Sequence, residues 1–518
     1  MYPVQYREVR TRFSGIFKPL SVSSAALAVA LMCTAPSVVS GEEVVLKSND
    51  GSTYLKGDLL SYDGEMFRLG TTIGTLQIAA LSVECEGAAC PSARTSEMPL
   101  RVLGGTPKVA DLIGALVFGL GEEMNTRPQQ RMISPEKMSF LLNGTDPDDP
   151  HQIVVASGDA AADTRALHDG HADMLIGSRL EVEGEDMAKY LLAHDAMVAL
   201  VSPQSPRNAL TLQDLSGVLR GTVTNWSELG GPDLRIVLAW PEDDPELMSA
   251  LTARFGTLTE HGRRMSADRM ADFVRRTPAA IGFSRYSNRR SAKPMTLVSD
   301  CGLVTAITDF TIRTGDYPLS LPVNLYHKAG GGGPDANSLI KFAMSREGRE
   351  LISDAGLIAP GMATTGIDAL GPFMISAVTA ARGEAELADI QDLFNHLVGA
   401  ERTSAVLRFD SGSYRINVAT HGDLSELAAD LAGRLGDHSE LVIVGFTDEV
   451  EASQQRRDLA RARSEAVRDG LLAAGLPENT TARIQTLAYE AIAPIGCNSD
   501  PEGRAQNRRV ELWVRQAS

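Results

Sequence analysis

The chain has 518 residues, of which 43% are hydrophobic, and a formal net charge of −17 at neutral pH. This length exceeds what one hydrophobic core usually supports, so the sequence predicts a multidomain protein. The acidic balance argues against a nucleic acid partner.

Residues 1–40 have the pattern of a secretory signal peptide. An apolar run from Ala25 to Met32 follows a basic stretch, and small residues lead to a cleavage point expected near Gly41. The run is too short to span a membrane, and the bulky Met32 before Cys33 is unfavourable for lipoprotein processing. The segment holds four basic residues and one acid, so the mature chain would carry about −20. We expect a periplasmic, secreted protein.

Residues 42–100 are expected to form a small β-module. Short β-type runs alternate with turn signals, including Asn49 to Ser52 and Asp63-Gly64. This pattern favours a compact, SH3-like or Sm-like barrel, which either mediates contacts or acts as a spacer.

The cysteines of the mature chain fall into two sets. Cys85 and Cys90 bracket a tight loop, which an oxidising compartment is expected to close as a disulfide. Cys301 and Cys497 either pair across domains or stay as buried free thiols, and the sequence favours free thiols.

Residues 101–362 alternate between strand-like and helix-like patterns, which predicts an α/β domain. Gly104-Gly105-Thr106 lies between a strand and a helix expected from Lys108 to Leu120, a geometry that presents backbone amides to a ligand. Two further segments stand out, T-N-W-S-E-L-G-G at Thr224 to Gly231 and G-D-Y-P-L-S at Gly315 to Ser320.

These segments resemble the phosphate-type periplasmic solute-binding proteins. The resemblance covers nearly all of residues 101–362 and implies two lobes of the type II class that close over a ligand. It implies candidate ligand-binding positions at Gly105, Thr106, Ser157, Ser178 and Arg179. The alternative is that Thr106 and Ser157 cap helices and that Arg179 pairs with a carboxylate.

One part of the phosphate pattern is missing. Where the family has Arg followed by Ser-Gly-Thr, this chain reads R-I-V-L-A-W-P-E-D-D-P-E-L from Arg235 to Leu247. Three carboxylates, those of Glu242, Asp243 and Asp244, would repel a phosphate dianion. We therefore expect a ligand other than simple phosphate, with amines and sugars as candidates.

The last 156 residues fall into two parts. Residues 363–400 have apolar spacings of three and four, which predict a helical connector. Residues 401–518 are expected to form a βαβαββ domain, with strands near Val406–Phe409, Leu441–Gly445, Ile484–Ala488 and Arg509–Val514 and helices near Asp423–Leu435 and Asp458–Ala474.

Three ordered motifs mark this last domain. They are G-F-T-D at Gly445 to Asp448, a D-L-A-R-A-R helix from Asp458 to Arg463, and N-R-R-V-E from Asn507 to Glu511. Together they resemble the OmpA C-terminal family of peptidoglycan-binding domains, which implies association with the cell wall or the outer-membrane face.

The resemblance implies a site for the diaminopimelate stem peptide of peptidoglycan. Diaminopimelate offers an ammonium and a carboxylate together, so Asp448 would take the ammonium and Arg463 the carboxylate. Thr447 and Phe446 would shape the rim, and Asn507 and Arg508 would brace the fold beside the site. Without the motif, Asp448 would read as a helix cap and Arg463 as a solvated charge.

Three positions depart from the family pattern. Phe446 replaces the usual His, Glu451 replaces a loop Gly, and Arg456 stands where Asn is common. These changes put the shape of the loop and the affinity of the site in doubt.

Three classes of function compete. The favoured one is a non-catalytic protein that tethers a solute-binding, sensor-like domain to the wall. The alternative is a structural adaptor whose binding-protein domain docks a partner protein. Catalysis rests only on the H-D-G-H-A-D segment from His168 to Asp173, which is more often a surface turn than a metal site, so we expect no enzyme, metal or cofactor.

Overall fold

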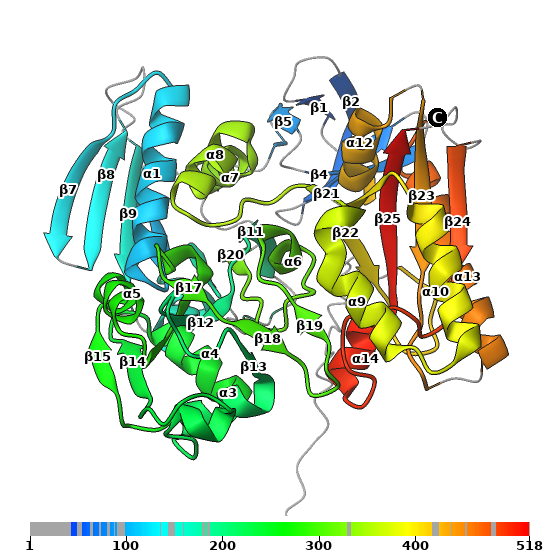
Figure 1. Cartoon of the computed structure of the whole chain (residues 1–518). Helices are drawn as coiled ribbons and strands as arrows, with labels where there is room; N and C mark the ends of the chain where they lie inside the picture. Colours follow the sequence, from blue (N-terminus) through cyan, green and yellow to red (C-terminus); the bar gives the residue numbers. More distant parts are fainter. Residues whose placement is uncertain are drawn as a thin grey trace, which may run out of the picture.

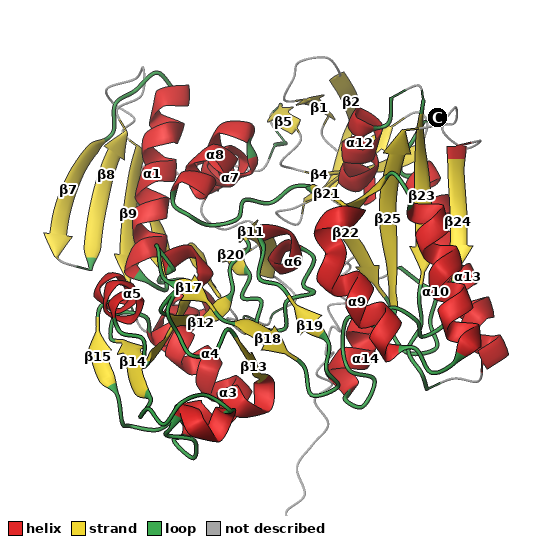
Figure 2. Ribbon diagram, in the orientation of Figure 1, coloured by secondary structure: helices red, strands yellow, loops and turns green. Residues whose placement is uncertain are grey.

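The computed structural model describes residues 43–48, 54–62, 66–71, 74–79, 83–87, 89–90, 99–134, 136–142, 151–158, 160–178, 182, 184, 187–328, 333–416, 424–436, 438–450, 453–477 and 483–516. The expected signal peptide lies outside them. Five sheets organise this part of the chain (Figures 1 and 2). In the same part, no helix is long and apolar enough to cross a membrane.

The first sheet is antiparallel throughout. Its strands are β1 (Glu43–Ser48), β2 (Tyr54–Tyr62), β3 (Met66–Thr71), β4 (Gly74–Ala79) and β5 (Val83–Glu86), in the order β4-β3-β2-β1-β5. Val44, Leu46 and Leu69 form its core because alternate residues of each strand face one side. No pairing joins β4 to β5 among the described residues, so the expected barrel is here a sheet open at both edges.

Lobe 1 is built on a seven-stranded sheet of order β11-β20-β10-β6-β9-β8-β7. Its strands are β6 (Leu100–Gly104), β7 (Gln129–Ser134), β8 (Lys137–Leu142), β9 (His151–Ser157), β10 (Met174–Ser178), β11 (Met187–Ala193) and β20 (Val323–Lys328). Its helices are α1 (Pro107–Glu123), α2 (Ala160–His168), α7 (Gly333–Met344) and α8 (Arg346–Asp354). Strand β6 runs parallel to β9 and β10, so the carboxyl ends of these three strands meet at one edge.

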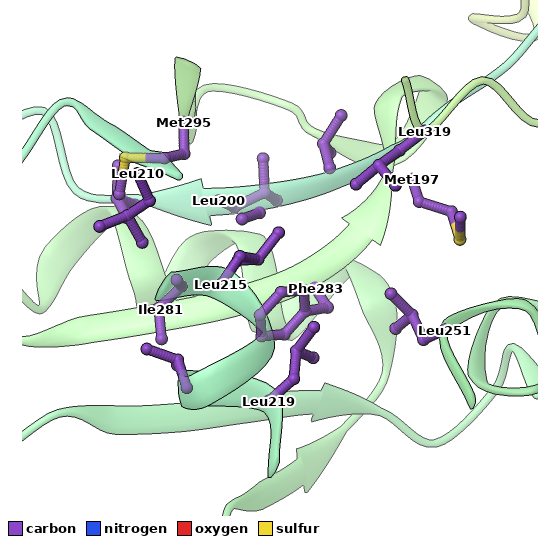
Figure 3. Packing of buried hydrophobic residues seen from close by; sticks show 14 of the residues in the cluster. Met197, Leu200, Leu210, Leu215, Leu219, Leu251, Ile281, Phe283, Met295 and Leu319 are labelled. Atoms are coloured by element: carbon purple, nitrogen blue, oxygen red, sulfur yellow. The ribbon is translucent and has the colours of Figure 1, made fainter. Parts of the chain in front are cut away.

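Lobe 2 has a five-stranded sheet of order β15-β14-β16-β12-β17 and a small sheet of order β13-β18-β19. The strands are β12 (Met197–Val201), β13 (Ala209–Thr211), β14 (Val237–Pro241), β15 (Arg263–Met265), β16 (Ala280–Arg285), β17 (Lys293–Pro294), β18 (Thr296–Val298) and β19 (Val304–Thr305). The helices are α3 (Leu212–Arg220), η2 (Trp226–Leu229), α4 (Pro245–Phe255), α5 (Ala267–Arg276), η3 (Tyr286–Asn288) and α6 (Asp309–Arg313). Figure 3 shows part of its core, where Leu215 and Leu219 of α3 pack near Leu200 and Phe283.

The chain passes between the lobes twice, and the two crossings lie side by side. The first runs from β11 to β12 through His194 and Asp195, and the second leads from α6 to β20. Backbone hydrogen bonds join them, with Leu321 N donating to Asp195 O at 2.7 Å and Met197 N to Leu319 O at 2.8 Å. Paired crossings of this kind form a two-strand hinge between lobes.

The C-terminal sheet has the order β21-β22-β25-β23-β24. Its strands are β21 (Thr364–Gly366), β22 (Ala400–Arg408), β23 (Ser439–Gly445), β24 (Ile484–Ala488) and β25 (Arg509–Gln516). Its helical elements are η4 (Ile367–Leu370), α9 (Gly371–Ala380), α10 (Glu384–Leu397), α12 (Leu424–Arg434), α13 (Ser453–Ala473) and α14 (Pro501–Asn507). The expected βαβαββ order gains the short helix α14, because Asp500 caps it and Pro501 starts it.

Both faces of this sheet are buried because β23 alternates its side chains between them. Val442 and Val444 pack with Leu393 and Leu397 of α10 on one face. Leu441 and Ile443 pack with residues of α12 and α13 on the other. Residues 363–400 thus supply β21, α9 and α10 to the C-terminal unit, which lies at the right of Figure 1.

A disulfide joins lobe 2 to the C-terminal unit. Cys301 and Cys497 are bonded with a Cα–Cα distance of 5.7 Å, so the expectation of two free thiols was wrong. The turn at Cys301 lies against the loop before α14, a contact across 196 positions that no local pattern reveals. The expected disulfide between Cys85 and Cys90 is present.

Buried ion pairs reinforce this junction. Arg402 of β22 donates to Asp316 at 2.7 Å and lies 3.1 Å from Glu511 of β25. Burial opposes ionisation of Asp316, but Arg402 and Arg408 outweigh it and lower the pKa of this carboxyl. Removing one partner would leave a buried charge without its counterion, so we take this cluster to fix how the two units dock.

The interdomain disulfide predicts a measurable thiol count and stability effect. The chain from Gly41 onward has four cysteines, and thiol titration of the denatured, unreduced protein should find none. Because the bond closes a loop of 196 positions, replacing Cys301 and Cys497 by Ser should cost up to about 5 kcal/mol and lower the melting temperature. The matched control, Cys85→Ser with Cys90→Ser, should have a smaller effect. Two reactive thiols per chain would contradict the assignment.

The hinge histidine predicts a pH dependence. Burial, together with nearby Arg313, lowers the pKa of His194 from 6.5 to about 4. Because the folded pKa lies below the unfolded one, stability is fully present above pH 6.5 and falls as the pH drops toward 4. His194→Gln should remove about 2 kcal/mol of that fall between pH 7 and 4.5 in urea unfolding. Equal pH slopes for parent and variant would contradict this.

Candidate functional site

The first candidate site lies where lobe 1 meets lobe 2. Gly105 follows β6, Ser157 ends β9 and Ser178 ends β10, so the parallel strands bring these three positions to one edge. Thr106 is buried and caps α1, since its hydroxyl accepts a hydrogen bond from Val109 N at 3.3 Å. Arg179 lies outside the described residues.

A buried arginine from lobe 2 reaches this edge. Arg285, the last residue of β16, is 3% exposed. It donates Nε to Asp244 Oδ2 at 2.6 Å, Nη2 to Glu246 Oε2 at 2.9 Å and Nη1 to Ser178 Oγ at 2.8 Å. The guanidinium thus links two carboxylates of lobe 2 to a hydroxyl of lobe 1.

Glu246 places its carboxylate against the backbone of lobe 1. Oε2 accepts a hydrogen bond from Ser178 N at 3.3 Å. Oε1 has no hydrogen-bond partner among the described residues and lies so close to Gly105 that a Cβ there would collide with it. Burial raises the pKa of Glu246, against the opposing effect of Arg285. A larger residue at position 105 would displace this carboxylate from the place it has here.

The helix α4 explains why Glu246 points there. Asp244 caps the helix by accepting from Leu247 N at 2.9 Å, and Pro245 occupies the first turn. Glu246 then sits in the first turn, where the helix dipole favours a negative charge.

The acidic segment from Glu242 to Asp244 contributes only in part. Glu242 is exposed, and Asp243 caps α5 instead by accepting from Ala267 N at 2.9 Å. Asp244 alone of the three contacts Arg285. Neither Glu246, two residues beyond the acidic run, nor Arg285, which directly follows the A-A-I-G-F-S segment, was expected at this site from the sequence.

A second contact across the lobes lies near the hinge. Lys108 Nζ, from α1, donates to Ser287 O at 2.9 Å and to Asn288 Oδ1 at 2.7 Å. Ser287 in turn donates its hydroxyl to Asp195 Oδ2 at 2.7 Å. Side chains of the chain itself therefore join the two lobes at this point as well.

The histidine segment carries no metal-like cluster. His168, Asp169 and His171 are exposed, and Asp173 pairs with Arg101 at 3.1 Å. No group of three His, Cys, Asp or Glu residues could hold a metal ion within the described part of the chain.

The second candidate site lies at the end of β23. Asp448 is 4% exposed, accepts from Arg508 Nη1 at 2.7 Å through Oδ2 and from Val450 N at 3.1 Å through Oδ1. Arg508 also donates to Phe409 O at 2.9 Å. The carboxylate therefore has an internal cationic partner, Arg508.

Arg463 of α13 reaches the same turn and is fully buried. It donates Nε to Ser413 O at 2.8 Å, Nη2 to Asp410 O at 3.1 Å and Nη1 to Phe446 O at 3.4 Å. Arg463 thus contacts the turn from Phe409 to Ser413 directly, and Asp448 is linked to the same turn through Arg508. Both candidate ligand residues therefore lie beside this turn.

The remaining predicted residues differ in role. Phe446 is buried against the Arg509 guanidinium, whose carbon lies 4.1 Å from the ring centroid, so it faces the core and not the rim. The Thr447 hydroxyl is buried and has no hydrogen-bond partner among the described residues. Asn507 accepts from Ile495 N and Gly496 N at 2.9 and 3.1 Å and so braces the loop before α14.

The residues that depart from the family pattern are placed in part. Arg456 pairs with Glu490 at 2.9 Å, which ties the start of α13 to the end of β24. Glu451 lies outside the described residues.

An apolar cavity of about 150 Å³ lies at the junction of lobe 2 and the C-terminal unit. Phe310 of α6 and Phe373 of α9 line it, with Asp316 and Arg402 in its wall. It includes none of the residues that the sequence singled out as ligand-binding.

Comparison with protein families matches two segments of the chain. Residues 144–347 match the model described as PBP superfamily domain. Residues 408–508 match the model of the OmpA family.

Individual relatives cover the same two regions. The phosphate-binding protein PstS of Bacillus subtilis is 23% identical over 37% of this chain and 64% of its own length. The peptidoglycan-binding protein ArfA of Mycobacterium bovis is 29% identical over 24% of this chain and 36% of its own. The probable lipoprotein YiaD of Escherichia coli is 31% identical over 20% of this chain and 46% of its own. The chain thus spans from about a third to under two thirds of these relatives.

Two solved structures are similar to different parts of this chain. An ABC-type phosphate transport receptor from Vibrio cholerae is 20% identical and covers 50% of this chain and 99% of its own, with a TM-score of 0.41. The peptidoglycan-associated lipoprotein from Burkholderia pseudomallei is 27% identical and covers 21% of this chain and 90% of its own, with a TM-score of 0.19. By its family matches, the chain carries a PBP superfamily domain at residues 144–347, followed by an OmpA family domain at residues 408–508.

Proposed function

We propose that the chain is a non-catalytic periplasmic protein that is anchored to peptidoglycan by its OmpA family domain. The observation that carries the proposal is the placement of Asp448 and Arg463 beside one turn, on a domain matched to the OmpA family. The name of the ArfA relative supports peptidoglycan as the ligand. The signal-like pattern of residues 1–40 supports export to the periplasm, at the wall or the outer-membrane face.

The anchoring chemistry is an exchange of partners. The ammonium of a diaminopimelate stem peptide would replace Arg508 at the Asp448 carboxylate. Its carboxylate would take the Arg463 guanidinium from the backbone carbonyls of Asp410 and Ser413. The carboxylate would give Arg463 a bidentate ion pair in place of bonds to neutral carbonyls, which favours this half of the exchange once the turn from Phe409 to Ser413 moves.

The PBP superfamily domain presents a solute-binding fold for which we propose a ligand other than simple phosphate. Glu246 and Asp244 place two carboxylates around Arg285, so the three groups together carry a net charge of −1. A phosphate dianion entering there would meet this negative charge at close range in a buried setting. Amines and sugars remain the candidate solutes.

A second function for this domain is that of a structural adaptor, which docks a partner protein in place of a solute. One observation favours it, because the Glu246 carboxylate occupies the edge where Gly105 and Ser178 meet. The disulfide and the Arg402 cluster would transmit load between a docked partner and the wall-bound unit.

Wall anchoring predicts loss of co-sedimentation on removing either charge. The protein from Gly41 onward should pellet with purified diaminopimelate-type peptidoglycan, and Asp448→Asn or Arg463→Lys should weaken this at least about tenfold, or 1.4 kcal/mol. Asn keeps an acceptor for Val450 N, and Lys keeps the positive charge.

The matched control is Arg461→Ala, an exposed charge on the same helix, which should pellet like the parent. Circular dichroism checks that each variant is folded. Variants of Asp448 and Arg463 that are folded and pellet as well as the parent would refute the site.

The middle domain predicts no saturable binding of inorganic phosphate. Isothermal titration with phosphate should give no binding below about 1 mM, since the site already holds two carboxylates. A thermal-shift screen of amines, sugars and wall fragments then separates the two functions. A shift with one solute supports sensing, whereas no shift together with a stoichiometric protein that co-purifies through residues 101–362 supports the adaptor. Submicromolar phosphate binding would contradict both.

A further inference from the structure

The meeting point of the lobes has the chemistry of an occupied anion site. We define the inter-lobe site by Gly105 and Ser178 of lobe 1 and by Asp244, Glu246 and Arg285 of lobe 2. Two donors converge on the Glu246 carboxylate, Ser178 N at 3.3 Å and Arg285 Nη2 at 2.9 Å. Because Gly105 has no side chain, there is space beside it, and Glu246 Oε1 fills that space. A backbone amide and a guanidinium are favourable donors for a carboxylate, and the glycine leaves room for it.

The carboxylate in this site belongs to Glu246, a residue of the chain itself, and it connects the two lobes. Glu246 belongs to α4 of lobe 2, whereas Ser178 ends β10 of lobe 1. Arg285 adds a second bridge from lobe 2 to Ser178 Oγ at 2.8 Å. The glutamate therefore contacts the opposite lobe in the way a ligand held between the lobes would.

Charge counting decides which free ligands could replace it. Arg285 carries +1, and Asp244 and Glu246 carry −1 each, so the site without Glu246 is neutral. A monocarboxylate would restore the present charge of −1, whereas a dianion would raise it to −2 in a buried setting. The site therefore discriminates by charge as well as by size.

We propose that the inter-lobe site is a carboxylate-binding site whose resident ligand is the side chain of Glu246, so that the chain keeps its own lobes together without a diffusible solute. When that side chain is removed, the vacated space takes a compact monocarboxylate such as acetate or formate in preference to phosphate. The inference rests on the second function proposed for the middle domain, in which no free solute is bound, and it is independent of wall anchoring, which uses a different domain.

Intramolecular tethering explains why free anions do not displace Glu246 in the parent protein. A group fixed on a neighbouring helix acts at a high effective concentration. Asp244 and Pro245 fix the first turn of α4 and thus the direction of the Glu246 side chain. A free anion would have to compete with this tether and leave Glu246 buried without its partners.

The test is chemical rescue of Glu246→Ala in the chain from Gly41 onward. The variant should melt several degrees below the parent in chloride, because Arg285 loses one of its two carboxylates. Acetate or formate at constant ionic strength should raise its melting temperature saturably and give a millimolar dissociation constant by titration calorimetry. Phosphate at pH 8 should do so at least about tenfold less well.

Two controls separate specific filling from general salt effects. Glu242→Ala removes an exposed carboxylate from the same segment and should behave like the parent, with no response to acetate. Glu246→Gln keeps an amide in the space, which should block the entry of acetate, although the loss of one carboxylate weakens the contact with Arg285.

The outcomes are decisive in both directions. A folded Glu246→Ala variant that shows no saturable response to acetate or formate overturns the proposal. If that variant does not fold, limited proteolysis of Glu246→Gln tests the proposal. The loss of one carboxylate should loosen the contact between the lobes and speed cleavage. Cleavage as slow as that of the parent overturns the proposal. Peptidoglycan co-sedimentation of each folded variant should match the parent, so failure here is distinct from failure of wall anchoring.

Discussion

The structure depends on one buried charge, the guanidinium of Arg285 between the two lobes. A buried cation must be matched by anions and hydrogen-bonded, and Asp244, Glu246 and Ser178 accept four hydrogen bonds from Arg285. The same groups fill the edge at which the strands of lobe 1 end. The hydrogen bonds that satisfy Arg285 therefore also fill this edge with side chains of the chain itself.

A second buried cluster ties this domain to the C-terminal unit. Asp316, on the second hinge crossing, meets Arg402 of the C-terminal sheet, and the disulfide between Cys301 and Cys497 holds the same junction. Asp316 also precedes Tyr317, which donates to Met197 O at 3.1 Å in lobe 2. The hinge, the junction and the C-terminal sheet thus share one continuous set of contacts.

The sequence predicted the architecture better than the sites. Ordered motifs located the two matched domains, and most of the C-terminal strands expected there lie within a few residues of their observed bounds, because these patterns are local. The pairing of Cys301 with Cys497, the bond of Arg508 to Asp448 and the meeting of Arg285 with Glu246 were missed because each joins distant segments. Phe446 was expected at the rim, yet the sheet turns it inward against Arg509. The acidic run drew attention to the right segment, but only the cap at Asp244 shows that Glu246 is the residue aimed at lobe 1.

The most direct test of the central claim is the distance between the lobes in the absence of solute. Lys137 of lobe 1 and Arg264 of lobe 2 are both exposed, and spin labels can be attached to cysteines introduced at these positions. Double electron–electron resonance then measures the distance between the labels. The native cysteines do not take up label because they are held in disulfides. The account predicts one narrow distance distribution that neither phosphate nor other solutes change. A broad or longer distribution that narrows only when a solute is added would contradict it, because the lobes would then wait for a ligand from outside.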